Sequence, residues 1–200
     1  FPLNSPEFEE FITKVHSNLR LSARFNIPWT VLHPLQNEGV DPNNREEIMQ
    51  INTAFFRSLI PIIDETGVGI AIENMIGGQF TDAASLLELL NRIDGKDRFG
   101  LCWDTGHAHL NKLDQVKSIQ MMGNKLKATH IADNRGLADD HLFPFSGTID
   151  WEPIAKALQT SGYEGVFSFE VHNATMNHPV ELRESVLKNG FAIGNYLINV

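Results

Sequence analysis

The sequence predicts a parallel (β/α)8 barrel that is incomplete on its N-terminal side. Five short apolar runs have strand character, and each is followed by turn residues and a helical pattern. Each run also ends in Asp, Glu or His, namely His33, Glu73, Asp104, His130 and Glu170. In a parallel barrel the C-terminal strand ends meet on one face, so we expect these five residues to become neighbours there.

Alternation within the runs also favours a barrel. Side chains two and four positions before each terminal residue share its face, and most of them are small. This set is Trp29, Val31, Gly69, Ala71, Gly100, Cys102, Leu126, Ala128, Val166 and Ser168. The opposite face is mostly large and apolar, as with Ile70, Trp103 and Phe169, which suits helices packed outside a crowded interior. In the fourth run, alternation places Lys127 on this outer face.

Helical periodicity predicts helices between the runs. The first covers 5–25, with Ser5 as its N-cap and Pro6 at the first helical position. A polar loop at 34–44 precedes a helix at 45–65. Further helices are expected at 81–94 with Thr81 as the cap, at 113–122, at 149–162 and at 178–200. The stretch 133–148 is a long loop, and loops of this length in compact domains are commonly functional.

Composition excludes several classes of protein. The chain has 200 residues with 42% hydrophobic content, which suffices for one domain with a core over 1–200. The single cysteine, Cys102, excludes an intrachain disulfide and favours a reducing compartment. No signal peptide or membrane-spanning run is visible, so a cytoplasmic location is expected. A net charge of −9 without a basic run disfavours a nucleic-acid partner.

The strand count falls short of a complete barrel. The five runs begin about 34 residues apart, close to the ~31 residues per unit of a ~250-residue barrel. They use the whole chain, which starts with Phe1, so three strands are missing. Two explanations stay open. The sequence is the C-terminal part of a longer protein, or it is a natural short form that completes its sheet as a homo-oligomer.

Motifs at the strand ends resemble a known family. They are AIEN at 71–74, CWDTGHAH at 102–109, THIADN at 129–134, DDHLFPFSGTIDW at 139–151 and FSFEVH at 167–172. Together they resemble the xylose isomerase-like TIM barrel superfamily, in particular its sugar phosphate isomerase/epimerase group. That group is similar to endonuclease IV of AP endonuclease family 2. The chain departs from the pattern where Pro144-Phe145-Ser146-Gly147 replaces the usual Pro-Gly-x-Gly, and where the first three strands are absent.

The resemblance implies a metal centre held by Glu73, Asp104, His130 and Glu170. Three carboxylates and one imidazole are a mostly oxygen donor set that suits Mn²⁺, Mg²⁺ or Co²⁺, with Zn²⁺ as a further candidate. A single acid at a strand end is ordinarily a helix cap or a hydrogen-bond acceptor. Four such residues at four strand ends are improbable by chance, which disfavours that simpler interpretation for the set.

A second group matches the other ligands of the multi-zinc relatives or their substrate contacts. Its members are His33, His107, Asp139 and His141. His107 belongs to a D-x-x-H motif that touches substrate or a second metal, whereas His33 also suits a simple strand terminator. Asp139 and Asp140 lie in a polar loop, where simple solvation is the alternative interpretation, and we expect at most one of them to bind metal. Arg135 either holds a hydroxyl-rich or anionic substrate or is an ordinary surface residue.

Two chemistries compete for this arrangement. In a sugar or sugar phosphate isomerase or epimerase, a metal polarises a carbonyl and its adjacent hydroxyl. Glu73 and Glu170 then remove and return the proton between them through a cis-enediolate. The alternative is a zinc phosphodiesterase acting on abasic DNA, which needs a basic groove that the sequence does not offer. A non-catalytic metal-binding barrel fragment is the third interpretation. The isomerase leads, although the sequence names no sugar and shows no Gly-rich phosphate loop.

Overall fold

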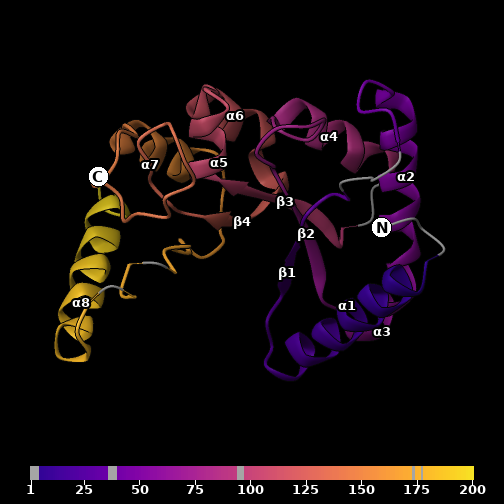
Figure 1. Ribbon diagram of the computed structural model, residues 1–200, viewed down its shortest axis with the longest axis horizontal. Coiled ribbons are helices and arrows are strands. Elements are labelled where there is room, and N and C mark those ends of the chain that lie inside the picture. The colour runs from indigo at the N-terminus through magenta and orange to yellow at the C-terminus, as the bar shows by residue number, and fades with distance from the viewer. Residues whose placement is uncertain (1–4, 36–39, 94–96, 173, 177) are drawn as a thin grey trace.

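Four parallel strands in the order β1-β2-β3-β4 form the centre of the computed structural model, which describes residues 5–35, 40–93, 97–172, 174–176 and 178–200 (Figure 1). The strands are β1 Trp29–Leu32, β2 Gly69–Glu73, β3 Phe99–Asp104 and β4 Leu126–His130. Each strand pairs in parallel with the next, so the chain returns through a helix outside the sheet after every strand. This confirms the predicted incomplete barrel.

Most helices lie close to the predicted positions. They are α1 Pro6–Arg24, α2 Arg45–Ser58, α3 Ile60–Thr66, α4 Ala83–Arg92, α5 Thr105–Leu110, α6 Gln115–Met122, α7 Trp151–Thr160 and α8 Val180–Leu197, with a 3-10 turn at Gly123–Lys125. Ser5 caps α1 as predicted. Asp82, not Thr81, caps α4, because its carboxylate accepts the Ser85 N–H at 2.8 Å. Among the described residues, no helix is both long and apolar enough to cross a membrane.

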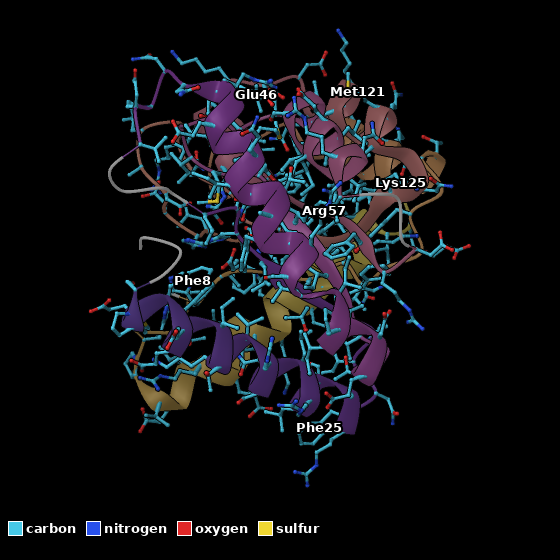
Figure 2. The ribbon with its side chains drawn as sticks, turned by 90° about the vertical axis from the view of Figure 1, so that its right-hand side faces the viewer. Phe8, Phe25, Glu46, Arg57, Met121 and Lys125 are labelled. Atoms are coloured by element: carbon cyan, nitrogen blue, oxygen red, sulfur yellow. The ribbon has the colours of Figure 1, made fainter. Side chains whose placement is uncertain are left out.

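The helix expected at 45–65 is two helices. α2 ends at Ser58 and α3 starts at Ile60, with Pro61 in its first turn. Proline has no N–H and its ring collides with the preceding turn, so it is accepted at a helix start but not inside a helix. Figure 2 shows α2 along the outer surface, with Glu46 and Arg57 near its ends. Parts of the expected loop at 34–44 and the end of the helix expected at 81–94 lie outside the described residues.

The fifth predicted strand, at 165–170, is not a regular strand. It forms one parallel bridge, between Ile131 and Phe169. The Ile131 N–H donates to the Ser168 carbonyl at 2.8 Å, and the Glu170 N–H donates to the Ile131 carbonyl at 3.1 Å. In the described part of the chain no strand pairs with its other side, and Val166 is 78% exposed. The bridge still places Glu170 next to the end of β4.

A bulge in β4 reverses the predicted orientation of its first residues. Leu126 is paired with β3, but the next pair along the ladder involves Ala128, so Lys127 is the additional residue. Leu126 therefore joins the apolar core under the helices. Lys127 instead turns to the inner face, against Gly100, with its ammonium 5.7 Å from the centroid of the Trp29 ring. Strict alternation was wrong for both Leu126 and Lys127.

The apolar core lies between the sheet and the helices outside it. Trp103 is fully buried there, as alternation predicts, and its Nε1 donates to Gln115 Oε1 of α6 at 3.3 Å. Phe56 of α2 packs against Phe55 and Phe99, with ring centroids 4.7 and 6.3 Å away. Each such side chain contributes about 1.5–3 kcal/mol on burial. This packing fixes the strands and therefore the positions of their C-terminal ends.

Candidate metal centre

Four chain segments bring one group of side chains together at the strand ends. Glu73 ends β2, Asp104 ends β3, His130 ends β4, and Glu170 follows the bridge to Ile131. One ligand atom from each of the four lies within 4.8 Å of the others. His130 Nδ1 is 2.9 Å from Glu73 Oε1 and 3.2 Å from Glu170 Oε2. We call these four residues the rim group.

The side chains of the rim group shift one another's pKa values. Burial alone would raise the pKa of Glu73, but hydrogen bonds with His130 and His33 outweigh it and lower the pKa. The hydrogen bond with His130 lowers the pKa of Glu170 to about 2. Burial opposes the charge of His130, yet its two glutamate partners more than compensate and raise its pKa to about 10. A protonated His130 is therefore the positive charge between two carboxylates.

Asp104 is the carboxyl group of the rim group whose negative charge is least favoured when no ion is bound. Burial, with the nearby charges of Glu73 and Glu170, raises its pKa well above the ordinary value. Its Oδ1 accepts the His107 N–H at 2.7 Å and so caps α5. Its Oδ2 is buried and has no hydrogen-bond partner in the described part of the chain. A buried oxygen without a donor is costly, and a cation beside it would satisfy it. The donor set and this unpaired oxygen both fit a divalent ion.

Asn74 positions Asp104, a role that the sequence did not reveal. Its Oδ1 accepts the Asp104 N–H at 2.7 Å, and its Nδ2 donates to the Asp104 carbonyl at 3.0 Å. The carbonyl of Asn74 also lies 2.8 Å from His107 Nδ1. A side-chain amide carries a donor and an acceptor on two separate atoms, which matches these two backbone groups. The AIEN motif contained the residue, but its partner lies on the neighbouring strand.

Asp133 organises the long loop beside the rim group and was also missed. Its carboxylate accepts the Gly147 N–H at 3.0 Å and Trp151 Nε1 at 2.9 Å. A Cβ on Gly147 would lie 2.2 Å from Asp133 Oδ1, so this position accepts only glycine. Phe145 has a φ of 71°, a left-handed conformation, at the place where the resemblance has glycine.

The second predicted group borders the rim group. His33 Nε2 lies 3.1 Å from Glu73 Oε2, and that hydrogen bond raises the pKa of His33. Asp139 Oδ2 lies 2.9 Å from His141 Nε2 and 3.6 Å from His107 Nε2, so one carboxylate faces two imidazoles. Whether these residues contact substrate or a second ion stays a prediction.

Arg135 does not join either group through its guanidinium. The Arg135 side chain is 61% exposed, and its guanidinium lies 3.9 Å from Asp140 Oδ2. Asp140 is thus turned to a surface arginine, whereas Asp139 faces the histidines. A role for Arg135 in substrate binding stays a prediction that this geometry does not support.

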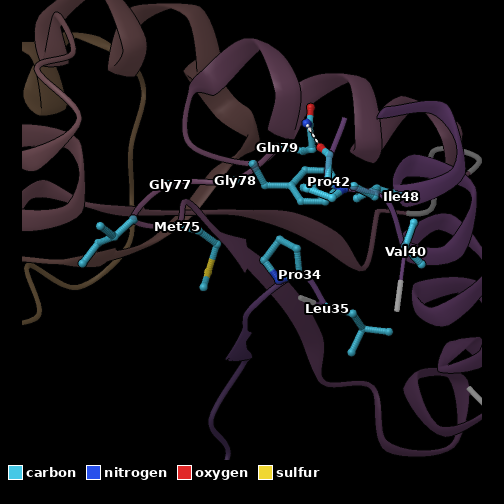
Figure 3. Close-up of a pocket in the computed structure, with 11 residues that line it drawn as sticks. Pro34, Leu35, Val40, Pro42, Ile48, Met75, Gly77, Gly78 and Gln79 are labelled. Atoms are coloured by element: carbon cyan, nitrogen blue, oxygen red, sulfur yellow. Dashed lines mark hydrogen bonds between the residues drawn. The ribbon is translucent and has the colours of Figure 1, made fainter. Parts of the chain in front are cut away.

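An apolar cavity of about 350 Å³ lies beside the rim, between the loops that follow β1 and β2 (Figure 3). Pro34 directly follows His33, and Met75 lies two residues beyond Glu73. The lining is Pro34, Leu35, Val40, Pro42, Ile48, Met75, Ile76, Gly77, Gly78, Gln79 and Phe80. The Gln79 amide donates to the Pro42 carbonyl at 2.9 Å. Among these described residues there is no Lys, Arg or His, so the cavity suits an uncharged group.

Three relatives match much of this chain but only part of their own length. The uncharacterized protein y4fM of Sinorhizobium fredii is 36% identical over 156 residues, covering 77% of this chain and 50% of the relative. An inosose isomerase of Bacillus velezensis is 26% identical and covers 82% and 60%. A probable endonuclease 4 of Mycoplasma mycoides is 29% identical and covers 62% and 45%. The chain therefore spans roughly half of the length of these relatives.

The fold is shared with solved structures. A crystal structure of the IolI protein with a bound zinc atom has a TM-score of 0.78 at 22% identity, and covers 98% of this chain and 71% of that one. A D-tagatose 3-epimerase-like protein has a TM-score of 0.76 at 24% identity, and covers 96% and 73%. The family described as xylose isomerase-like TIM barrel matches residues 2–189. The chain belongs to the xylose isomerase-like TIM barrel family.

Proposed function

We propose that this chain forms the metal-holding part of a divalent-metal-dependent sugar isomerase or epimerase. The observation that carries the proposal is the rim group, which gathers three carboxylates and one imidazole within 4.8 Å at the strand ends. Relatives in the family include an inosose isomerase, which supports isomerisation of a sugar-like substrate. The zinc in the IolI structure supports a divalent ion.

Glu73, Asp104, His130 and Glu170 would hold the ion. When bound, the ion would polarise a substrate carbonyl and the adjacent hydroxyl, which makes the C–H between them more acidic. The mostly oxygen donors favour Mn²⁺, Mg²⁺ or Co²⁺, and Zn²⁺ also fits this set. Asp104 is fully buried behind the others and suits a ligand rather than a proton carrier.

The two glutamates supply the acid–base groups. Glu170 has a 36% exposed side chain and can meet a substrate directly. Glu73 is 2% exposed and held by His33 and His130, so its carboxylate is fixed in orientation. One glutamate removes the proton from the substrate carbon, and the other returns a proton, so that the configuration or the carbonyl position changes.

The lining of the neighbouring apolar cavity indicates what kind of substrate would fit. Its position next to His33 and Glu73 suits the part of the substrate that does not react. Because no cationic side chain lines it in the described residues, a phosphate there would be unpaired. We therefore propose an unphosphorylated sugar or polyol ketone as the substrate.

The test is solvent exchange by the full-length protein, because this chain spans only part of its relatives. Given a panel of ketoses in deuterated water with Mn²⁺ or Mg²⁺, it should incorporate deuterium at the carbon next to the carbonyl. Glu170→Gln and Glu73→Gln should stop turnover and keep some sugar binding, since each carboxylate is both ligand and base. Cleavage of abasic DNA without exchange on any ketose would refute the proposal. For the 200-residue chain alone we expect weak activity or none.

Abasic-site hydrolysis is the second candidate. It is favoured by the placement of Asp139 between His107 and His141, and by the relative named probable endonuclease 4. The net charge of −9 counts against binding a DNA backbone. This candidate predicts zinc-dependent cleavage of abasic duplex DNA and a steep loss of DNA binding as salt rises.

A further inference from the structure

A second set of ligand-type side chains lies on the outer side of Glu170. One atom from each of His141, Glu170 and His172 lies within 4.8 Å of the others. Two ligand atoms bound to one ion at about 2.0–2.2 Å are at most ~4.4 Å apart, so small side-chain adjustments suffice. We infer that these three residues form a second divalent-ion position that shares Glu170 with the rim group.

His141 is oriented for metal binding. Its Nδ1 lies 2.8 Å from the Glu170 backbone carbonyl, and this contact fixes the ring and leaves Nε2, which faces Asp139, as the ligand atom. Metal-binding histidines usually hold their second nitrogen in this way. His141 also has a φ of 49°, an uncommon conformation that the surrounding contacts must maintain. Strain of this kind is concentrated at functional sites.

His172 brings a second imidazole to the same place. It follows Glu170 by two residues, at the start of a turn. Its ring centroid lies 4.2 Å from that of His141, at an interplanar angle of 50°. No role was predicted for His172 from the sequence, although it ends the FSFEVH motif.

Asp139 completes the surroundings of this position. Its Oδ2 lies 2.9 Å from His141 Nε2, and its Oδ1 is buried with no hydrogen-bond partner in the described part of the chain. A cation near His141 would give that oxygen a partner. Asp139 is thus available as a fourth ligand or as an acceptor that orients the imidazole.

The chemistry of this set differs from that of the rim group. Two imidazoles and a carboxylate are the donors of many zinc sites, and such sites keep one coordination position open. The rim group has a single imidazole among three carboxylates. We therefore expect the second position to select Zn²⁺ over Mg²⁺. The inference rests on the proposed function only through the shared Glu170.

Zinc stoichiometry tests the inference. The full-length protein is equilibrated with Zn²⁺ at fixed free concentration, and bound zinc is measured by elemental analysis. Two zinc ions per chain are expected, and one for His172→Ala. His178→Ala is the matched control, because His178 is also exposed and lies outside both ligand sets. It should keep two ions.

Other variants separate the two sites. Asp104→Asn should lose the rim ion and keep the ion that depends on His172. A single ion in the unmodified protein that persists in His172→Ala, or two ions in His172→Ala, would overturn the inference. So would loss of the second ion on His107→Ala but not on His172→Ala. If only the His172-dependent ion is found in the unmodified protein, this inference stands and the proposed rim centre is wrong. Circular dichroism confirms that each variant is folded.

Discussion

The imidazole Nδ1 of His130 lies 2.9 Å from Oε1 of Glu73, although 57 positions separate the two residues. They end β4 and β2, which are not neighbours, because β3 runs between them. The contact therefore closes over the end of β3, where Asp104 is buried beneath it. Curvature of the half-barrel sheet makes this closure achievable, and it turns three separate strand ends into one group.

Asp104→Asn should weaken binding of a divalent ion by more than the ~10–100-fold that is typical when an outer partner of a ligand is lost. Asparagine can still accept the His107 N–H and cap α5, so the fold should persist. Isothermal titration with Mn²⁺ measures the effect. Asp114→Asn, which changes the cap of α6 away from the rim, is the control and should bind normally. Unchanged affinity in Asp104→Asn would exclude Asp104 as a ligand.

Metal binding should release a proton and strengthen as pH rises. The pKa of His130 is raised to about 10 from 6.5, so in that window His130 is protonated when no ion is bound, and an ion must displace its proton. Without metal, the contribution of His130 to folding stability changes in the opposite direction and falls as pH rises. A raised pKa stabilises the fold fully below pH 6.5, and this contribution is lost as pH rises through about 10. Titration at pH 7.5 in buffers of different ionisation enthalpy measures proton release. His130→Gln should release less, and equal release in both proteins would contradict the assignment.

Asn74→Ala should lower the free energy of unfolding by about 1–3 kcal/mol, because it leaves the buried N–H and carbonyl of Asp104 without their partners. It should also weaken metal binding, since Asp104 is then less well positioned. Urea denaturation measures the first effect and titration the second. Asn18→Ala on the exposed face of α1 is the control and should change neither. A stability loss without any change in metal affinity would show that Asn74 only supports the fold.

Phe145→Gly should be more stable than Phe145→Val by about 1–2 kcal/mol. Both changes remove the ring that packs on Tyr196, so the comparison isolates the backbone. The left-handed φ of 71° suits glycine and is strained for a β-branched residue. Thermal or urea unfolding of the two variants provides the measurement. Equal stabilities would mean that the loop relaxes to a different conformation.

The strand ends were predictable because a parallel barrel has simple geometry. A terminal Glu73, Asp104 or His130 must reach the same rim when consecutive strands pair in parallel, whatever the loops do. The fifth run supplied Glu170 at the rim even without forming a regular strand, because a single bridge at Ile131 suffices to align it. Long-range position here depends on topology, which the repeat of strands and helices encodes.

Features that depend on a specific partner were not predictable. Asn74 and Asp133 are positioned by backbone groups on other segments, which no local pattern reveals. The division of α2 from α3 occurs at Pro61. The proline is visible in the sequence, but the apolar periodicity continues past it and predicted one helix. The guanidinium of Arg135 lies at the surface beside Asp140, because loop geometry decides where a long side chain points.

The bulge in β4 couples packing to chemistry through one residue. In a regular strand Leu126 and His130, four positions apart, would face the same way. With Lys127 inserted, the leucine seals the hydrophobic layer while the histidine faces the rim. Without this additional residue, Leu126 could not lie in the core while His130 faces the rim, because a shift of one residue exchanges the faces of a strand. Spacing between these two residues is thus as much a requirement of the site as the identity of its ligands.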